Sequence, residues 1–306
     1  MKFLRLILLC CFFLPGTDAA EAGDKPKIML INSDSSVDKY KEVEEAFREA
    51  APNPVAEIDL GDEKWDSRSI ETLLYDESPE LTYCIGTKAY QTASRYVGGK
   101  SIIIFSSVLN WLRMPLTSET YGVSNELHVE MQLALFRYIF PDIRKIGMLY
   151  SRQYTEELFK NAGDEARKMG IEIIAYAVSQ ENPAVSALNK ILSEADALWL
   201  ISDPDVMSDK KQLSRILKEC DAKKKPVFSY HEAVADMGAV LVLSVDNPTI
   251  GRQAARITAK VISGGKPHES VQTPAGSHII LNLKKVKEYG LKYNENALES
   301  VNSIIR

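Results

Sequence analysis

The chain has 306 residues, of which 45% are hydrophobic and 26% are charged, and its formal net charge is −5 at pH 7. These values are ordinary for a soluble protein of one large or two smaller globular domains, and they exclude a disordered chain and a polytopic membrane protein. No dense run of Lys and Arg accompanies the acidic balance, so no nucleic-acid partner is expected.

Residues 1–22 have the three-part pattern of a secretory signal peptide. Lys2 and Arg5 form a basic start, an unbroken apolar run covers Leu6–Leu14, and Ala20-Glu21-Ala22 has the small-x-small form of a cleavage site. The apolar run is too short to span a bilayer. We therefore expect removal of residues 1–22 and a soluble, periplasmic mature chain, with an uncleaved anchor or a buried helix as the alternatives.

The four cysteines do not indicate a disulfide scaffold. Two of them lie in the apolar run of residues 1–22, where Leu9 stands in place of the small residue that precedes the cysteine of a lipoprotein signal. Cleavage would leave Cys84 and Cys220, which are far apart in sequence and belong to no CxxC pair. We expect two isolated, buried thiols.

Short apolar runs then alternate with amphipathic helix patterns. The first series predicts, in chain order, a strand at 27–31, a helix at 38–50, a strand at 55–60, a helix containing 70–75, a strand at 81–85, a helix at 88–97 and a strand at 101–105. Near-continuous apolar strands between helices indicate parallel strands covered on both faces. Residues 106–120, with Asn110, Pro115 and several Ser and Thr, predict a loop.

A second alternating series follows the loop. It predicts helices at 125–140, 155–169, 184–192, 209–220, 233–237, 250–263 and 284–289, and strands at 145–150, 171–177, 197–201, 226–229, 240–245 and 279–283. Gly264-Gly265 with Pro267 behind it is a typical stop for the helix at 250–263. Two series of similar size indicate two doubly wound α/β domains with a cleft between them.

Polar side chains follow the predicted strands at their carboxyl ends, the edge at which open α/β sheets bind ligands. The candidate ligand-binding residues are Ser33, Thr87, Ser106, Ser107, Ser151, Asp203, Tyr230 and Asp246. Thr87, Ser106 and Ser151 would donate hydrogen bonds to the acceptor end of a ligand. Asp203 and Asp246 would hold a cationic group, with the ring of Tyr230 as a side wall. Each carboxylate has an equally weighted structural interpretation, as a turn cap for Asp203 and as a hinge tie for Asp246.

The motifs of catalysis and of cofactor binding are absent from the sequence. Gly98-Gly99-Lys100-Ser101 lacks the earlier glycine of a phosphate-binding loop and leads into a strand, and no GxGxxG follows a strand. There is no GxSxG or HExxH, and no pair of histidines has metal-ligand spacing. We therefore expect a protein that is not an enzyme and that holds neither a cofactor nor a metal.

The C-terminal half carries a family resemblance. Its segments are DALWLISDP at 196–204, KPVF at 225–228, LSVD at 243–246, GRQAA at 251–255, ISGGKP at 262–267 and NLKK at 282–285. Over residues 140–292 their order and spacing resemble the ABC transporter substrate-binding proteins of the tryptophan/tyrosine-binding type. The N-terminal half differs from many members, which have an Asp-Pro segment where this chain reads Ser-Ser-Val-Leu-Asn-Trp after residue 105.

The resemblance implies the type I periplasmic-binding-protein fold, which has two doubly wound parallel-sheet lobes joined by a three-stranded hinge. The N-terminal lobe would comprise 23–122 plus 247–273, and the C-terminal lobe 123–246 plus 274–306. The crossings between them would lie near 121–125, 245–248 and 272–275, and a bound ligand would close the lobes.

The function that follows is that of a monomeric periplasmic solute-binding protein. It would capture a small molecule, such as an amino acid and an aromatic one among the candidates, and deliver it to an ABC permease of the inner membrane. Two alternatives remain: a sensor that presents the solute to a membrane receptor, and an exported α/β enzyme.

Overall fold

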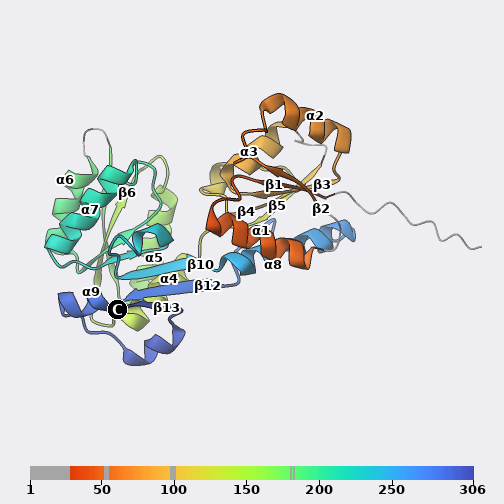
Figure 1. The fold of residues 1–306 in the computed structure, drawn as a ribbon. Helices are drawn as coiled ribbons and strands as arrows, with labels where there is room; N and C mark the ends of the chain where they lie inside the picture. The colour runs from red at the N-terminus through yellow and green to blue at the C-terminus, as the bar shows by residue number, and fades with distance from the viewer. Residues whose placement is uncertain (1–27, 52–54, 97–100, 180, 182) are drawn as a thin grey trace, which may run out of the picture.

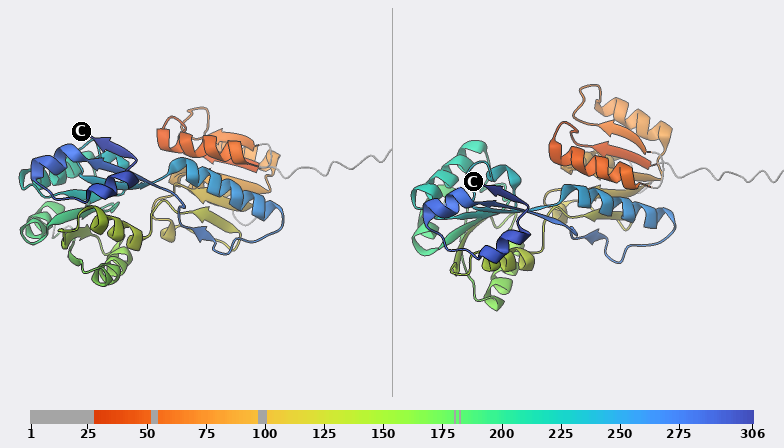
Figure 2. Two further views of the ribbon diagram at one scale, coloured as in Figure 1. Left: turned by 90° about the horizontal axis from the view of Figure 1, so that it is seen from below. Right: turned by 60° about the horizontal axis from the view of Figure 1, so that its bottom comes forward.

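A computed structural model describes residues 28–51, 55–96, 101–179, 181 and 183–306. The chain forms two α/β lobes, each built on one sheet and connected by narrow crossing segments (Figures 1 and 2). The predicted two-lobed α/β class is thereby confirmed. The predicted signal peptide lies outside the described residues. No helix in the described part of the chain is long and apolar enough to cross a membrane.

The first sheet has the strand order β11-β5-β4-β3-β1-β2, and all of its pairs are parallel. Its strands are β1 (Ile28–Asn32), β2 (Val55–Asp59), β3 (Leu81–Ile85), β4 (Ile102–Ser106), β5 (Thr120–Val123) and β11 (Val271–Gln272). The helices of this lobe are α1 (Asp38–Ala50), α2 (Ser67–Glu77), α3 (Thr87–Tyr96) and α8 (Asn247–Ile262), with the 3₁₀ turn η1 (Trp111–Arg113).

The second sheet has the order β13-β12-β10-β9-β8-β6-β7, in which only the β10–β12 pair is antiparallel. Its strands are β6 (Lys145–Tyr150), β7 (Glu172–Ala177), β8 (Ala197–Leu200), β9 (Val227–Ser229), β10 (Leu241–Val245), β12 (Ser277–Asn282) and β13 (Ser303–Ile305). The helices are α4 (Val129–Ile139), α5 (Glu156–Lys168), α6 (Ala184–Glu194), α7 (Lys210–Ala222) and α9 (Leu283–Tyr289), with the 3₁₀ segments η2 (Glu232–Val234) and η3 (Glu295–Ser300).

Helices cover both faces of each sheet, which explains why the strands read as continuous apolar runs. One buried cluster unites the inner faces of the two lobes, and Val123, Leu127 and Val245 carry it across the connection between them. The opposite face of each sheet has a separate core. Cys84 and Cys220 are free and buried in these two outer cores, and burial raises the pKa of the Cys220 thiol to about 12.

Several short elements and the start of α4 differ from the sequence predictions. The strand β5 occupies part of the expected loop and crossing. It was not predicted, because four residues are too few to show the alternation of a strand. The helix expected from residue 125 begins only at Val129, because residues 124–128 cross between the lobes. The helix expected at 233–237 is the single 3₁₀ turn η2, and the strands β11 and β13 and the segment η3 were not anticipated.

Hydrogen bonds tie the three crossings to one another, and Gln253 of α8 ties the third crossing to the first lobe. The Nε2 atom of Gln253 donates to Thr273 O at 2.9 Å, and its Oε1 accepts from Ala275 N at 3.1 Å. The His128 ring nitrogen lies 2.8 Å from the Thr273 hydroxyl, which joins the first crossing to the third. The backbone N–H of Asp246 donates to Gly276 O at 3.2 Å, which joins the second to the third.

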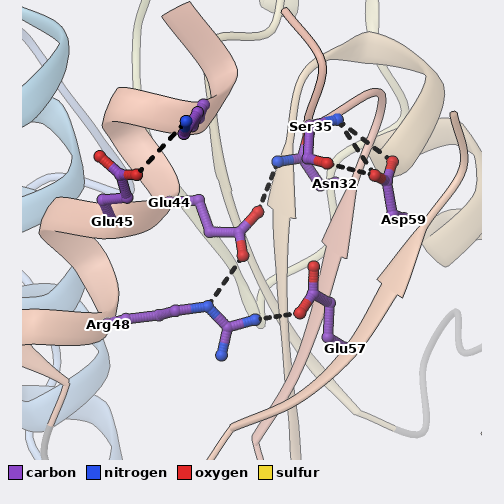
Figure 3. A network of polar contacts seen from close by, with 8 residues as sticks. Asn32, Ser35, Glu44, Glu45, Arg48, Glu57 and Asp59 are labelled. Atoms are coloured by element: carbon purple, nitrogen blue, oxygen red, sulfur yellow. Dashed lines mark hydrogen bonds and ion pairs between the residues drawn. The ribbon is translucent and has the colours of Figure 1, made fainter. Parts of the chain in front are cut away.

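Polar contacts anchor α1 to the first sheet (Figure 3). The buried Glu44 carboxylate accepts from Asn32 Nδ2 at 2.7 Å and from Arg48 Nε at 2.8 Å, and Arg48 also pairs with Glu57 of β2. The hydroxyl and the N–H of Ser35 both donate to the Asp59 carboxylate. Together these contacts fix the loop that follows β1, at the carboxyl edge of the sheet.

Helices α8 and α1 of the first lobe pack closely and lie side by side in Figure 1. A Cβ atom at Gly251 would lie 2.2 Å from Val43 O and 3.0 Å from Phe47 N. Neither obstacle is a flexible side-chain end, so both helix backbones must shift to admit a methyl group. At Gly163, within α5, a Cβ atom would meet nothing within 4 Å.

We therefore expect Gly251→Ala to lower the free energy of unfolding by about 3 kcal/mol through overpacking. The matched variant Gly163→Ala should raise it by about 0.5–1 kcal/mol, because alanine restricts the unfolded chain and favours the helix. Urea unfolding of the two variants beside the parent protein measures both changes. Equal stability of the Gly251→Ala variant and the parent would contradict the close contact.

Candidate ligand-binding cleft

Two neighbouring cavities lie between the lobes. One has a volume of about 270 Å³ and takes its walls from the start of α1, from the loop after β4 and from the strand ends of the second sheet. Its lining residues are Val37, Asp38, Lys39, Leu109, Asn125, Ser202, Tyr230, His231, Glu232, Ala233, Ser244, Val245 and Asn247. Because the walls come from both lobes, a change in the lobe angle changes this cavity.

The other cavity has a volume of about 420 Å³ and faces the first crossing. Its lining residues are Asn110, Trp111, Leu112, Arg113, Glu126, Arg152, Gln153, Tyr154, Thr155, Glu156, Glu157, Leu158, Lys160 and Tyr230. Tyr230 is the residue common to both cavities and so forms the wall between them. The cleft therefore combines aromatic and aliphatic surface with charged groups of both signs.

Tyr230 is a fixed wall of the cleft. It follows β9, is 9% exposed, and its phenol oxygen accepts a hydrogen bond from the backbone N–H of Ser202 at 2.8 Å. Burial, with the nearby Glu126 carboxylate, raises the pKa of Tyr230 far above its usual range, so the phenol stays neutral. Tyr230 thus lines the cleft, and its role as a side wall for a ligand stays a prediction.

The side chains of Asp203 and Ser151 hydrogen-bond to each other and stabilise the fold. The Asp203 side chain is fully buried, and its Oδ2 accepts from Ser151 N at 2.7 Å, Ser151 Oγ at 2.8 Å and Thr155 Oγ1 at 2.5 Å. Its Oδ1 accepts from the N–H groups of Asp205 and Val206. Five donors occupy this carboxylate, and neither Asp203 nor Ser151 lines a cavity of the cleft. The turn-cap interpretation of Asp203 therefore fits the geometry, and the cation-binding one does not.

Asp246 has a local role at the second crossing. Its Oδ2 accepts from Thr249 N at 2.9 Å and so caps the start of α8, while Arg252 Nη2 lies 3.7 Å away. It lines a third cavity of about 610 Å³, which shares Glu232, Ala233, Val245 and Asn247 with the cavity of about 270 Å³. The cap on α8 is a structural role for Asp246, and its proposed contact with a ligand stays a prediction.

The candidate hydroxyls of the first lobe lie beneath the cleft surface. Ser33 Oγ accepts from Ala89 N at 3.0 Å, Thr87 Oγ1 accepts from Leu109 N at 3.2 Å, and Ser106 Oγ lies 2.7 Å from the Tyr83 hydroxyl. These bonds tie the strand-end loops to α3 and to the sheet. Ser107 is buried with a φ of 56°, and its hydroxyl has no partner within the part of the chain that the structure describes.

The cleft also contains Lys39 and Arg113, which lie away from the predicted strand ends, and His231, which follows a predicted strand. Burial lowers the pKa of Lys39, and the Glu232 carboxylate of the opposite lobe opposes this shift. Burial and the Lys39 charge lower the pKa of His231. The Arg113 guanidinium lies 4.6 Å from the centre of the Tyr154 ring, a second contact between the lobes. These electrostatic contacts join the two sides of the cleft.

Exposed apolar side chains mark the rim of the cleft. Val37 is 36% exposed and Leu112 is 68% exposed, and each lines one of the two cavities from the first lobe. Leu112 belongs to the predicted loop 106–120, and Val37 lies just before α1. Among the described residues no group of three or more His, Cys, Asp or Glu could hold a metal ion.

The buried cluster around Asp203 yields a stability prediction. Asp203→Asn would turn an amide NH₂ toward groups that are themselves donors, so we expect a loss of about 3 kcal/mol in the free energy of unfolding. Thermal melts of the ligand-free protein measure this loss. The exposed neighbour Asp205 provides the control, and Asp205→Asn should melt with the parent protein. An unchanged melt of the Asp203→Asn variant would contradict the structural role.

Comparisons with known proteins agree with this architecture. The tyrosine-binding protein of Clostridioides difficile (strain R20291) is 23% identical over 253 residues, covering 76% of this chain and 72% of that protein. An L-Trp complex of an ABC domain from Streptococcus pneumoniae superposes with a TM-score of 0.61 at 18% identity, covering 91% of this chain and 100% of that one. The ligand-free, open structure of a Clostridium difficile substrate-binding protein with adhesive properties gives a TM-score of 0.68 at 18% identity, covering 91% and 98%.

The family itself is given by a sequence model. The family model described as ABC transporter substrate binding protein matches residues 28–305, which include every described strand and helix. The predicted resemblance is thereby confirmed. The chain belongs to the family of ABC transporter substrate-binding proteins.

Proposed function

We propose that this protein captures a small amphipathic solute, in first place an amino acid with an aromatic or apolar side chain, and delivers it to an ABC permease. The observation that carries the proposal is the pair of cavities on either side of Tyr230, with walls from both lobes. Trp111, Tyr154 and Tyr230 supply ring surface for an apolar body, and charged groups beside them suit the polar end of the solute. The names of the tyrosine-binding relative and of the L-Trp complex support this class of ligand.

Capture would proceed by closure of the lobes, with 23–122 and 247–273 moving against 123–246 and 274–306. The exposed side chain of Leu112 and the half-exposed one of Val37 would lose water on closure, and this burial would stabilise the closed form. The contact of Arg113 with Tyr154 already bridges the two lobes. Binding and closure require no nucleophile and no metal, so the proposed role involves no chemical step.

The proposed place of action is the periplasm. The expectation derives from the signal-peptide pattern of residues 1–22, with a mature chain that begins near Gly23. A family role at a transporter fits a location outside the cytoplasm. We propose a monomer, because one chain supplies both walls of the cleft.

Closure should be visible as compaction in solution. We expect the radius of gyration from small-angle scattering to fall when saturating L-tyrosine or L-tryptophan is added, because the lobes approach each other. Mass spectrometry of the solute that co-purifies from the native host provides the probe should neither amino acid bind. A scattering profile that does not change at saturation with a bound solute would refute closure.

The wall at Tyr230 should contribute directly to affinity. Tyr230→Ala removes the ring common to both cavities, and we expect binding of L-tyrosine to weaken about 30-fold, on the order of 2 kcal/mol. Calorimetry measures this change. Tyr75→Ala, which removes an 80% exposed ring on α2, is the control and should bind as the parent does. Equal affinities of the two variants would place the ligand elsewhere.

A further inference from the structure

Glu126 lies on the first crossing, at the wall of the cleft. It lies between β5 and α4, is partly buried, and lines the cavity of about 420 Å³ next to Tyr230. Hydrogen bonds fix the backbone on both sides of it: Ser124 Oγ donates to the Glu126 carbonyl at 3.0 Å, and Gln132 Nε2 donates to the Leu127 carbonyl at 3.0 Å. The carboxylate is therefore held at the cleft by a constrained backbone.

The Glu126 carboxylate lacks a counter-ion. Within the described ranges it has neither a hydrogen bond nor an ion pair, and burial alone raises the pKa of Glu126. A carboxylate that lines a cavity, is partly shielded from water and has no counter-ion lowers the stability of the folded chain, and a cationic partner would relieve this cost.

The other carboxylates that line the two cavities are accounted for. Glu156 pairs with Lys160 at 3.4 Å. Glu232 accepts a hydrogen bond from Ser244 Oγ and lies near Lys39 of the other lobe. The remaining two, Asp38 and Glu157, are exposed to water. Burial without a partner thus singles out Glu126 among the acidic groups of the cleft.

Aromatic rings stand around the same cavity. Trp111 and Tyr154 line it, and the neutral phenol of Tyr230 is close enough for the Glu126 charge to raise its pKa further. A cation beside Glu126 would meet the carboxylate and nearby aromatic side chains, and aromatic rings attract cations, more so where water is excluded. Arg113, Arg152 and Lys160 also line this cavity, so an anionic end of the same solute has cationic partners there.

We propose that Glu126 binds the positively charged group of the ligand, so that the protein selects solutes with a protonated amine. This inference rests on the proposed capture of a small solute between the lobes, and it assigns to Glu126 the role that sequence reasoning gave to Asp203 and Asp246. Arg113 and Arg152 line the same cavity, and pairing of Glu126 with one of them in the closed form is the competing explanation.

The first test compares two probes that differ only in the amine, L-tyrosine and 3-(4-hydroxyphenyl)propionate. We expect Glu126→Gln to weaken L-tyrosine at least tenfold in calorimetry and to leave the affinity for the propionate unchanged or higher. The matched control is Glu130→Gln, which removes an exposed carboxylate four residues along, on α4, outside both cavities. If Glu126→Gln weakened the binding of both probes equally, Glu126 would pair with an arginine and not with the amine of the ligand. Unchanged binding of L-tyrosine would also overturn the inference.

The second test needs no ligand and separates this inference from the proposed function. Because the folded-state pKa of Glu126 is raised, the folded chain holds its proton to higher pH than the unfolded chain does, and stability falls as pH rises through that window. Glu126→Gln removes the ionisable group and with it this fall in stability. The variant should therefore melt above the parent at about pH 8, with a smaller difference at about pH 5.

The two tests have distinct failures. If the parent protein binds neither tyrosine nor tryptophan, the proposed class of ligand is wrong, and the melts alone decide on Glu126. A Glu126→Gln variant that melts at or below the parent at about pH 8 would mean that the carboxylate has an internal partner, which overturns the inference whatever the ligand. Glu130→Gln should follow the parent at both pH values.

Discussion

The contact between α1 and α8 constrains the whole molecule. Helix α8 follows β10 of the second sheet along the chain, yet it packs on α1 of the first lobe, with Gly251 bringing the two backbones together. The chain must therefore leave the second lobe after β10 and return to it before β12. With the initial passage after β5, this produces three crossings, so neither lobe is one continuous stretch of sequence. The crossings hold the two lobes so that loops of the first lobe face strand ends of the second sheet, and the cleft lies between them.

Polar residues in and around the cleft fall into two groups, those that fix the loops and those that line the cavities. Side chains that follow strands accept hydrogen bonds from backbone N–H groups and hold the loops in place. Asp203 accepts from the turn that follows it, whereas Ser33 and Thr87 accept from segments distant in sequence, at Ala89 and Leu109. Groups one step further out, on helix starts, loops and crossings, reach the space between the lobes. Lys39, Arg113 and Glu126 belong to this outer set. The inner set shapes the cleft, and the outer set gives it its charge and its apolar surface.

Much of the fold could be predicted from sequence because its elements have strong periodicity. The helix at 38–50 and the strands at 81–85 and 145–150 have the predicted limits, since buried parallel strands and amphipathic helices leave clear patterns. Strands of two to four residues, such as β5 and β11, leave none. The site was less predictable, because a rule that looks at strand ends finds caps as readily as ligands. It pointed to Tyr230, which lines both cavities, and gave no signal for Glu126, whose place beside the cavity depends on contacts between distant segments.

The hydrogen bonds among the crossings have a thermodynamic consequence. His128 and Thr273 connect the first crossing to the third, and Gln253 of α8 ties the third crossing to the first lobe. A change in these contacts would shift the relative free energies of open and closed arrangements without touching the solute. The measured dissociation constant of such a protein equals the intrinsic one divided by the fraction of molecules that are competent to bind. Evolution could thus retune uptake at the hinge while the cleft, and with it the choice of solute, stays the same.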